Sequence, residues 1–76
     1  MKIEYDKEVD AIYIHIQCKQ VYRTIEVQEG INLDMDEDGK IIGLEILDAT
    51  KKYALSDIFN LTTENLILNE RALASA

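Results

Sequence analysis

The chain has very little of the covalent chemistry that stabilises many small domains. Its 76 residues include one cysteine, Cys18, and no proline or tryptophan. A lone thiol excludes a disulfide framework and is typical of a reducing compartment. A chain of this length buries only about 60–65% of the surface that its unfolded form exposes, so its own core leaves a narrow margin of stability. We therefore expect a homo-oligomer, most simply a homodimer, that gains buried area by association.

Basic residues are also scarce. Eight Lys and Arg stand against 15 Asp and Glu, which gives a net charge of −7 and a pI near 4.5. An excess of carboxylates repels phosphate groups, so this composition argues against nucleic acid as a partner and against binding to anionic membrane surfaces. A basic protein is the kind of partner that suits this charge.

Long hydrophobic runs are absent as well. No run approaches the roughly 20 residues that a membrane-spanning helix needs. The first residues, Met1 to Asp6, alternate apolar and charged side chains and lack the apolar segment of a signal peptide. With three glycines in the whole chain, nothing resembles a Gly-rich phosphate loop. We expect a cytoplasmic protein with one domain, residues 1–76, because there are no internal repeats or low-complexity segments.

What the chain does have is a strong alternation of apolar and polar residues. Hydrophobic residues make up 47% of it, and in the first two-thirds they recur at the period of a β-strand. The first two such stretches predict a hairpin with a four-residue turn at Lys7 to Asp10, because that register sets like side chains opposite each other. The predicted pairs are Tyr5 with Ile12, Ile3 with Ile14, Glu4 with Tyr13, and Lys2 with His15.

Three further strands are expected, over Val21 to Gln28, Ile31 to Asp36 and Ile41 to Leu47. Glu29-Gly30 indicates a turn or a bulge after the first of them. Asp38-Gly39 is a strong hairpin signal between the other two. An even-length loop centred there makes one face wholly apolar. The pairs that this register predicts are Met35 with Ile42, Leu33 with Leu44, and Ile31 with Ile46.

The last third of the sequence changes to a helical period. Ser56-Asp57 and Thr62-Thr63-Glu64 are typical of helix starts, with carboxylates near the positive end of the helix dipole. The apolar residues that follow predict an amphipathic helix from about Thr63 to Ala74. The expected fold class is therefore α+β: a small antiparallel sheet of four or five strands in two hairpins, with a C-terminal α-helix packed on one face.

Asp34, Asp36, Asp38, Gly39 and Glu45 match the calcium-loop pattern D-x-[DN]-x-[DN]-G-x5-E. A helix-loop-helix site needs a helix on each side, and both flanks here alternate like strands. In the predicted hairpin, Asp36 and Glu45 lie about 13 Å apart, too far to share one ion. The pattern therefore favours a plain hairpin, and the alternative is a surface calcium site formed by Asp34, Asp36 and Asp38.

The polar face of the predicted sheet gathers the remaining chemistry. A histidine beside carboxylates can hold a transition metal or transfer protons. Cys18 falls at the opposite parity from His15, so the two do not form a nucleophile pair. Asp34 faces Gly43, which has no side chain, so we expect a shallow notch there. The simpler interpretation, which we favour, is a solvated face or a dimer surface. The candidate residues are Glu4, Tyr13, His15, Asn32, Asp34 and Glu45.

Several segments keep a characteristic order and spacing: Tyr5 to Ile14, Thr24-x-Glu26, Ile31 to Asp34, and Asp38 to Ala49. Together they resemble the family called domain of unknown function 2283, over about residues 3 to 50. The resemblance implies a small antiparallel sheet followed by a helix, and it implies no activity or functional residues. Some members resemble small partners encoded beside toxin-like proteins, which implies an antitoxin-like role.

These observations predict a homo-oligomeric protein-interaction module without catalytic residues or cofactors. Its expected partners are a second copy of itself and, in an antitoxin-like role, a basic protein. The alternative is a ligand- or metal-binding protein, or an enzyme, that uses the polar face around His15, Asp34 and Glu45.

Overall fold

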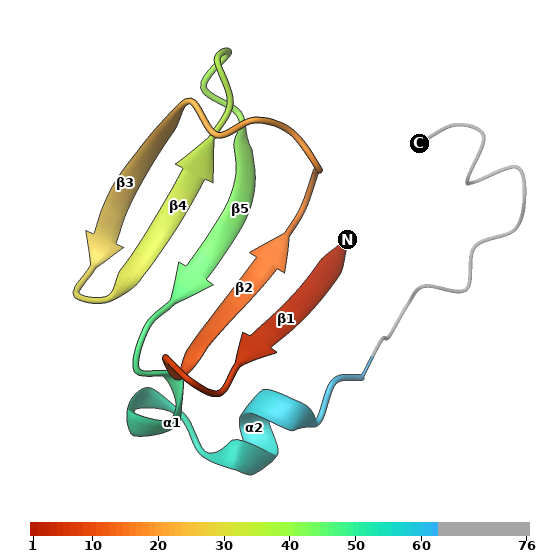
Figure 1. Ribbon diagram of the computed structural model, residues 1–76, viewed down its shortest axis with the longest axis vertical. Coiled ribbons are helices and arrows are strands. Elements are labelled where there is room, and N and C mark those ends of the chain that lie inside the picture. The colour runs from red at the N-terminus through yellow and green to blue at the C-terminus, as the bar shows by residue number, and fades with distance from the viewer. Residues whose placement is uncertain (63–76) are drawn as a thin grey trace, which may run out of the picture.

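The computed structural model describes residues 1–62, which form a five-stranded antiparallel sheet followed by two short helices (Figure 1). The strands lie in the order β1-β2-β5-β4-β3, so the two expected hairpins share one sheet through the pairing of β2 with β5. This arrangement confirms the α+β class. The elements are β1 (Lys2–Asp6), β2 (Ala11–His15), β3 (Arg23–Gln28), β4 (Ile31–Met35), β5 (Ile41–Ile46), α1 (Ala49–Lys52) and α2 (Leu55–Phe59).

The first hairpin has the predicted register, from Lys2 opposite His15 to Tyr5 opposite Ile12. Its turn ends at Asp10, whose φ of 53° lies in the left-handed region that aspartate tolerates better than most residues. The Asp10 carboxylate accepts hydrogen bonds from the Tyr5 hydroxyl (2.8 Å) and the Thr50 hydroxyl (2.7 Å). This side chain therefore ties the first turn to α1.

The hairpin of β4 and β5 departs from its predicted register at the turn. The Asp36 N–H donates to the Lys40 carbonyl (2.9 Å), which leaves a three-residue loop with Gly39 at a φ of 81°. The expected even-length loop, and the pairing of Met35 with Ile42, were wrong: Met35 faces Ile41, and the ladder shifts between Asp34 and Met35. Ile42 is the extra residue at this bulge. It restores the predicted pairs farther along, Leu33 with Leu44 and Ile31 with Ile46.

The strand β3 is shorter and less regular than the expected Val21 to Gln28. It begins at Arg23, although the Tyr22 N–H already donates to the Met35 carbonyl (2.8 Å). A second irregularity lies between Glu26 and Gln28, so Val27 falls outside the paired register and is 54% exposed. Gln28 then faces Ile31 across the Glu29-Gly30 turn.

Strand pairing aligns apolar side chains in rows that cross the sheet. One row takes one aliphatic residue from every strand, and we name it the central apolar row: Ile3, Ile14, Leu44, Leu33 and Ile25. A second row beside it contains Tyr5, Ile12, Ile46 and Ile31. No member of the central apolar row is buried, and Ile3 is 46% exposed.

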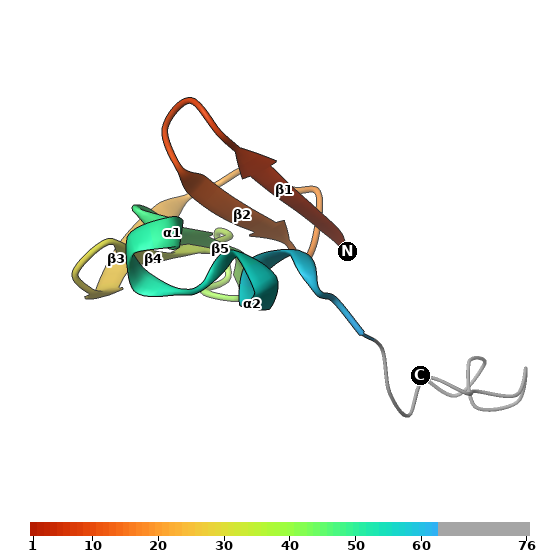
Figure 2. The same ribbon diagram turned by 90° about the horizontal axis from the view of Figure 1, so that it is seen from below.

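The two helices lie at one end of the sheet, beyond the ends of the strands (Figure 1), and Figure 2 shows the β1–β2 hairpin inclined to the other strands. Phe59 of α2 meets Tyr5 of β1 edge-on, with 5.2 Å between ring centroids. Neither helix packs extensively on any strand. Within residues 1–62 the buried hydrophobic side chains are therefore few: Ala11, Ile12, Ile42 and Ala49.

The helix start expected at Ser56-Asp57 corresponds to α2, which begins one residue earlier at Leu55. The start expected at Thr62-Thr63-Glu64 and the amphipathic helix from about Thr63 to Ala74 lie outside the described residues. In the part of the chain that the structure describes, neither helix is long and apolar enough to cross a membrane.

The bulge buries Ile42 and leaves its neighbour Ile41 exposed, so the two side chains should contribute differently to the stability of the fold. Ile42 is 2% exposed and Ile41 is 42% exposed. We expect Ile42→Ala to lower the free energy of unfolding by about 2–4 kcal/mol because it opens a cavity, whereas Ile41→Ala costs about 0.5 kcal/mol. Urea denaturation followed by circular dichroism measures both. Equal costs, or the reverse order, would contradict the observed register.

Candidate functional site

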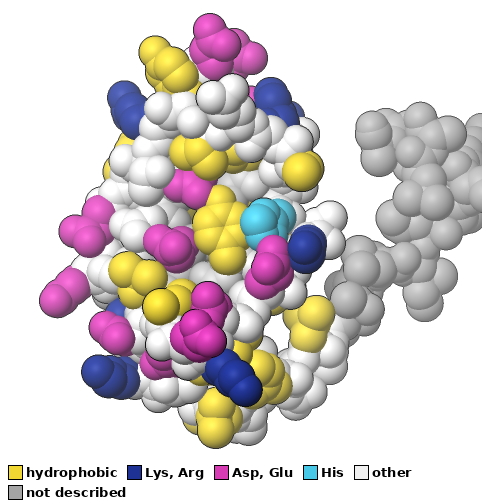
Figure 3. Space-filling view, viewed as in Figure 1, with side chains coloured by type: hydrophobic (Ala, Val, Ile, Leu, Met, Phe, Trp, Pro, Cys, Tyr) yellow, Lys and Arg dark blue, Asp and Glu magenta, His cyan; other side chains and the backbone are white. Residues whose placement is uncertain are grey.

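The structure brings all six candidate residues onto the polar face of the sheet. Cross-strand pairs run from Glu4 to Tyr13, from Tyr13 to Glu45 and from Glu45 to Asn32, while His15 and Asp34 flank Gly43 from the two sides. Figure 3 looks onto the face that carries the one histidine of the chain, with acidic side chains around it. The face therefore exists as predicted, and its chemistry depends on how these groups meet.

Tyr13 reaches across a neighbouring strand. Its ring lies over Gly43 of β5, and its hydroxyl donates to Oδ2 of Asp34 on β4. Oδ1 of the same carboxylate accepts a hydrogen bond from the Thr24 hydroxyl of β3 (2.6 Å). A Cβ at position 43 would lie 2.9 Å from Cζ of Tyr13, so the crossing requires glycine. The notch expected beside Asp34 is thus filled by the tyrosine ring.

The other polar groups of the face also have partners. Oε1 of Glu4 lies 2.7 Å from Nε2 of His15 and 3.3 Å from Nζ of Lys2. Hydrogen bonds to Lys2 and then to His15 hold the pKa of Glu4 below its ordinary value. The His15 ring lies against the Tyr13 ring, with 4.3 Å between centroids. Nδ2 of Asn32 donates to Oε1 of Glu45 (3.1 Å).

These contacts limit what the face can do chemically. Burial, and then the hydrogen bond to Asp34, raise the pKa of Tyr13 to about 12. Tyr13 is therefore a neutral hydrogen-bond donor at physiological pH and does not serve as a general base there. Asp34 already accepts two hydrogen bonds. The arrangement is that of a cross-linked sheet surface, with its side chains engaged by one another.

The calcium alternative needs Asp34, Asp36 and Asp38 to converge. Asp34 is engaged by Tyr13 and Thr24 on the polar face, whereas Asp36 is folded into the turn. Among residues 1–62, no three or more His, Cys, Asp or Glu side chains gather as a metal site requires. The hairpin accounts for the spacing of these carboxylates.

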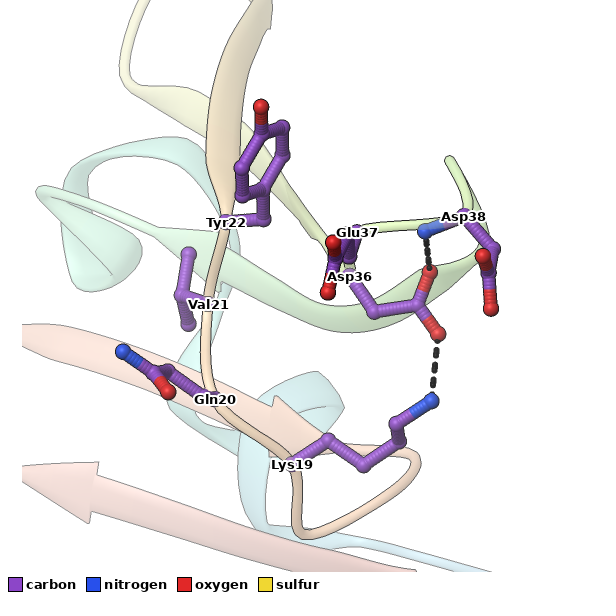
Figure 4. A pocket seen from close by; sticks show the side chains of 7 residues that line it. All are labelled: Lys19, Gln20, Val21, Tyr22, Asp36, Glu37 and Asp38. Carbon is purple, nitrogen blue, oxygen red and sulfur yellow. Dashed lines mark hydrogen bonds and ion pairs between the residues drawn. The ribbon is translucent and has the colours of Figure 1, made fainter.

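A second cluster, around Asp36, was missed by the sequence analysis. Asp36 is 4% exposed, and its Oδ1 accepts hydrogen bonds from the N–H groups of Asp38 and Lys40 (2.9 Å each). Its Oδ2 lies 2.7 Å from Nζ of Lys19, which comes from the segment between β2 and β3 (Figure 4). The ion pair with Lys19, and then the two backbone donors, lower the pKa of Asp36.

A shallow pocket of about 320 Å³ opens beside this ion pair (Figure 4). Val21 and Tyr22 contribute exposed apolar surface to it, and Glu37 and Asp38 contribute carboxylates. An aspartate at the start of a D-x-D-G turn commonly accepts hydrogen bonds from the backbone just after it, so this part of the cluster has a signal in the sequence. The contact with Lys19 depends on how the preceding connection folds back, and no local pattern encodes that.

Residues 2–49 match the model of a family described as "Protein of unknown function (DUF2283)". The chain belongs to this family. The DUF2283 match spans the strands, the polar face and the start of α1. It confirms the resemblance noted in the sequence.

Two curated relatives extend the comparison. The chain is 32% identical over 69 residues to "Uncharacterized protein MJ0789" of Methanocaldococcus jannaschii, an alignment that covers 91% of this chain and 53% of the relative. It is 38% identical over 55 residues to "Putative hypoxanthine phosphoribosyltransferase" of Methanosarcina mazei, covering 72% and 44% respectively. The chain thus spans about half the length of these relatives. No solved structure matches it.

The contact of Tyr13 with Gly43 can be tested by a double-mutant cycle. We expect Gly43→Ala to destabilise the fold by about 1–3 kcal/mol because the new methyl group displaces the ring. In a Tyr13→Phe background the same change should cost about 1 kcal/mol less, since the atom nearest the methyl group is gone. Urea denaturation of the four proteins gives the coupling energy, and strict additivity would contradict the contact.

The ion pair of Asp36 predicts a pH dependence. Because the folded state lowers the pKa of Asp36, the stabilisation is present above the ordinary carboxyl pKa of about 4 and is lost as the pH falls through the lower folded value. Asp36→Asn should therefore lower Tm at neutral pH, and the difference from wild type should narrow between about pH 5 and pH 2. Circular dichroism melts at each pH measure it.

The matched control is Glu37→Gln, which removes an exposed carboxylate of the same turn. It should change Tm little at any pH. A difference between wild type and Asp36→Asn that stays constant down to pH 2 would mean that the ion pair is not what stabilises the turn.

Proposed function

We propose that this protein is a cytoplasmic, homo-oligomeric protein-interaction module, and that it has no catalytic role of its own. The observation that carries the proposal is the open apolar face of the sheet. The central apolar row crosses all five strands, and no described element buries it. A sheet with one apolar face needs a second layer, and the described helices stand at its end.

The energetic argument for association is simple. Full burial of an Ile or Leu side chain contributes about 1.5–3 kcal/mol. Ile3 is 46% exposed and the other four members of the central apolar row are partly buried. Covering the row therefore contributes about 1 kcal/mol for Ile3 and less for each of the others, on the order of 2–3 kcal/mol in all, which is an appreciable part of the stability of a small domain. Contiguous exposed apolar patches of this kind mark protein-interaction surfaces.

The alternative, a ligand-binding, metal-binding or catalytic function of the polar face, has less support. Its acceptors and donors engage each other, through Tyr13 with Asp34 and His15 with Glu4. The Methanosarcina mazei relative is named as a putative transferase, and the alignment with this chain covers 44% of that relative. The sequence has no Gly-rich phosphate loop, and its net charge of −7 disfavours phosphate ligands. Neither feature supports assigning the transferase activity to this chain.

An antitoxin-like role remains part of the proposal. The polar face carries Glu4, Glu26, Asp34 and Glu45, and it is the side opposite the apolar rows. A basic protein would be attracted to this face by charge, with an association rate that falls as salt is added. The acidic composition of the whole chain supports the same kind of partner.

Self-association is the direct test. The monomer has a mass of 8.7 kDa, and we expect sedimentation equilibrium of the full chain to give twice that mass at micromolar concentration. We also expect Tm to rise with protein concentration between about 1 and 100 µM, because mass action favours the assembled state. A monomeric mass across that range, with a constant Tm, would overturn the proposal.

A further inference from the structure

We propose that the chain associates with a second copy edge to edge, by antiparallel pairing of β1 with β1 of the second copy about a twofold axis at Ile3. This inference rests on the proposed self-association and names its surface and its register. The two sheets then form one continuous sheet, and the two central apolar rows join end to end through Ile3.

The outer edge of β1 carries backbone groups that point away from the sheet. β1 is an outer strand, and within residues 1–62 only β2 pairs with it (Figure 1). The Ile16 N–H donates to the Ile42 carbonyl (2.8 Å), so even-numbered residues of β2 bond to β5 and odd-numbered ones bond to β1. Odd-numbered residues of β2 face even-numbered residues of β1. The N–H and C=O groups of Ile3 and Tyr5 therefore point outward.

The other outer edge, that of β3, does not fit β1. The Leu47 N–H donates to the Gly30 carbonyl (2.7 Å), and the same alternation directs outward the backbone of Thr24 and Glu26. Residues that face each other in an antiparallel pair share one face of the sheet. Pairing β1 with β3 would therefore set the apolar side chains of β1 opposite these polar ones. The irregularity between Glu26 and Gln28 also interrupts that edge.

Charge selects one register of β1 on itself. With the axis at Ile3, this residue faces its own copy, Lys2 faces Glu4 of the second copy, and Glu4 faces Lys2. Moving the axis by one residue sets Glu4 opposite Glu4 or Lys2 opposite Lys2, and like charges in these positions destabilise the pair. An axis between two residues would pair outward-pointing backbone groups with inward-bonded ones. A second copy of β1 therefore matches the edge in backbone, apolar side chain and charge.

The pairing gains its affinity from the main chain more than from buried area. The Ile3 residues of the two copies exchange N–H···O=C bonds, and the Tyr5 N–H donates to the Met1 carbonyl of the second copy. Ile3, which is 46% exposed at the end of its row, is covered at the same time. Interfaces below about 1,200 Å² are typically weak, so we expect a dimer Kd in the micromolar range.

The twofold axis stands perpendicular to the sheet, and this orientation determines what the dimer presents. Both polar faces turn to one side, so the carboxylates of the two copies, Glu45 and Asp34 among them, form one acidic surface. Both central apolar rows turn to the other side. A basic partner would therefore meet two equivalent acidic faces at once.

The test reverses charges at the edge in the full chain. Lys2→Glu and Glu4→Lys each set like charges opposite each other in the homodimer. We expect either variant to raise the homodimer Kd about tenfold or more in sedimentation equilibrium. An equimolar mixture of the two variants restores opposite charges at both positions, so it should form a heterodimer with a Kd within about threefold of wild type. Heterodimer formation also shows that both variants fold.

Lys7→Glu is the matched control, because it makes the same change of charge at an exposed position of the turn after β1. We expect its Kd to stay within about threefold of wild type, since no charged residue of the second copy faces it. If it raises Kd as much as Lys2→Glu does, or if the mixed variants form no heterodimer, the edge pairing is overturned.

A second measurement uses the wild-type protein alone. In a mixture of isotope-labelled and unlabelled chains, the Hα protons of Lys2 and Glu4 should show intermolecular NOEs, because these residues form the close, non-hydrogen-bonded pair. A dimer that lacks this NOE overturns the edge pairing and leaves self-association standing. A monomeric mass up to about 100 µM overturns both.

Discussion

The carboxylate of Asp36 determines how β4 passes into β5, and the two-sidedness of the sheet depends on that turn. By accepting hydrogen bonds from the backbone at Asp38 and Lys40, it closes a three-residue loop. A three-residue loop by itself would put polar side chains opposite apolar ones. The bulge at Ile42 takes up the extra residue, and beyond it every pair from Asp34–Gly43 to Ile31–Ile46 sets like against like.

The sequence predicted the regular part of this fold well. Alternation in the first hairpin and around Leu33 and Leu44 determined the strands, their registers and the composition of each face, because a one-residue slip would have turned every apolar side chain outward. It failed at the turn for a physical reason. Asp-Gly is compatible with loops of two or three residues, and the choice between them depended on a side chain bonding to its own backbone, with a compensating bulge that leaves no periodic signal.

The candidate site, too, was predicted only in part. Membership of the polar face followed from parity, so all six residues lie where the alternation placed them. Their contacts did not follow, because Tyr13 of β2 reaches Asp34 of β4 across β5, and the pairing of β2 with β5 joins two hairpins whose order in the sheet the alternation does not encode. Gly43 was read as an opening, and it is instead the place where the ring crosses. Polar groups on this face are engaged with one another, whereas no element within residues 1–62 buries the central apolar row on the other face. This contrast is the basis for assigning the protein a binding role.

The strand order has a further consequence for how the chain reaches its native state. Each hairpin joins neighbouring segments and closes a short loop, so β1–β2 and β3–β4–β5 form from local contacts. The pairing of β2 with β5 sets Ile12 opposite Ile46, residues far apart along the chain. Forming this seam therefore costs most of the loop-closure entropy. We therefore expect the docking of β1–β2 against β3–β4–β5 along this seam to be the slow step of folding. Until it occurs, the exposed edges of β2 and β5 are the surfaces most open to pairing with another chain.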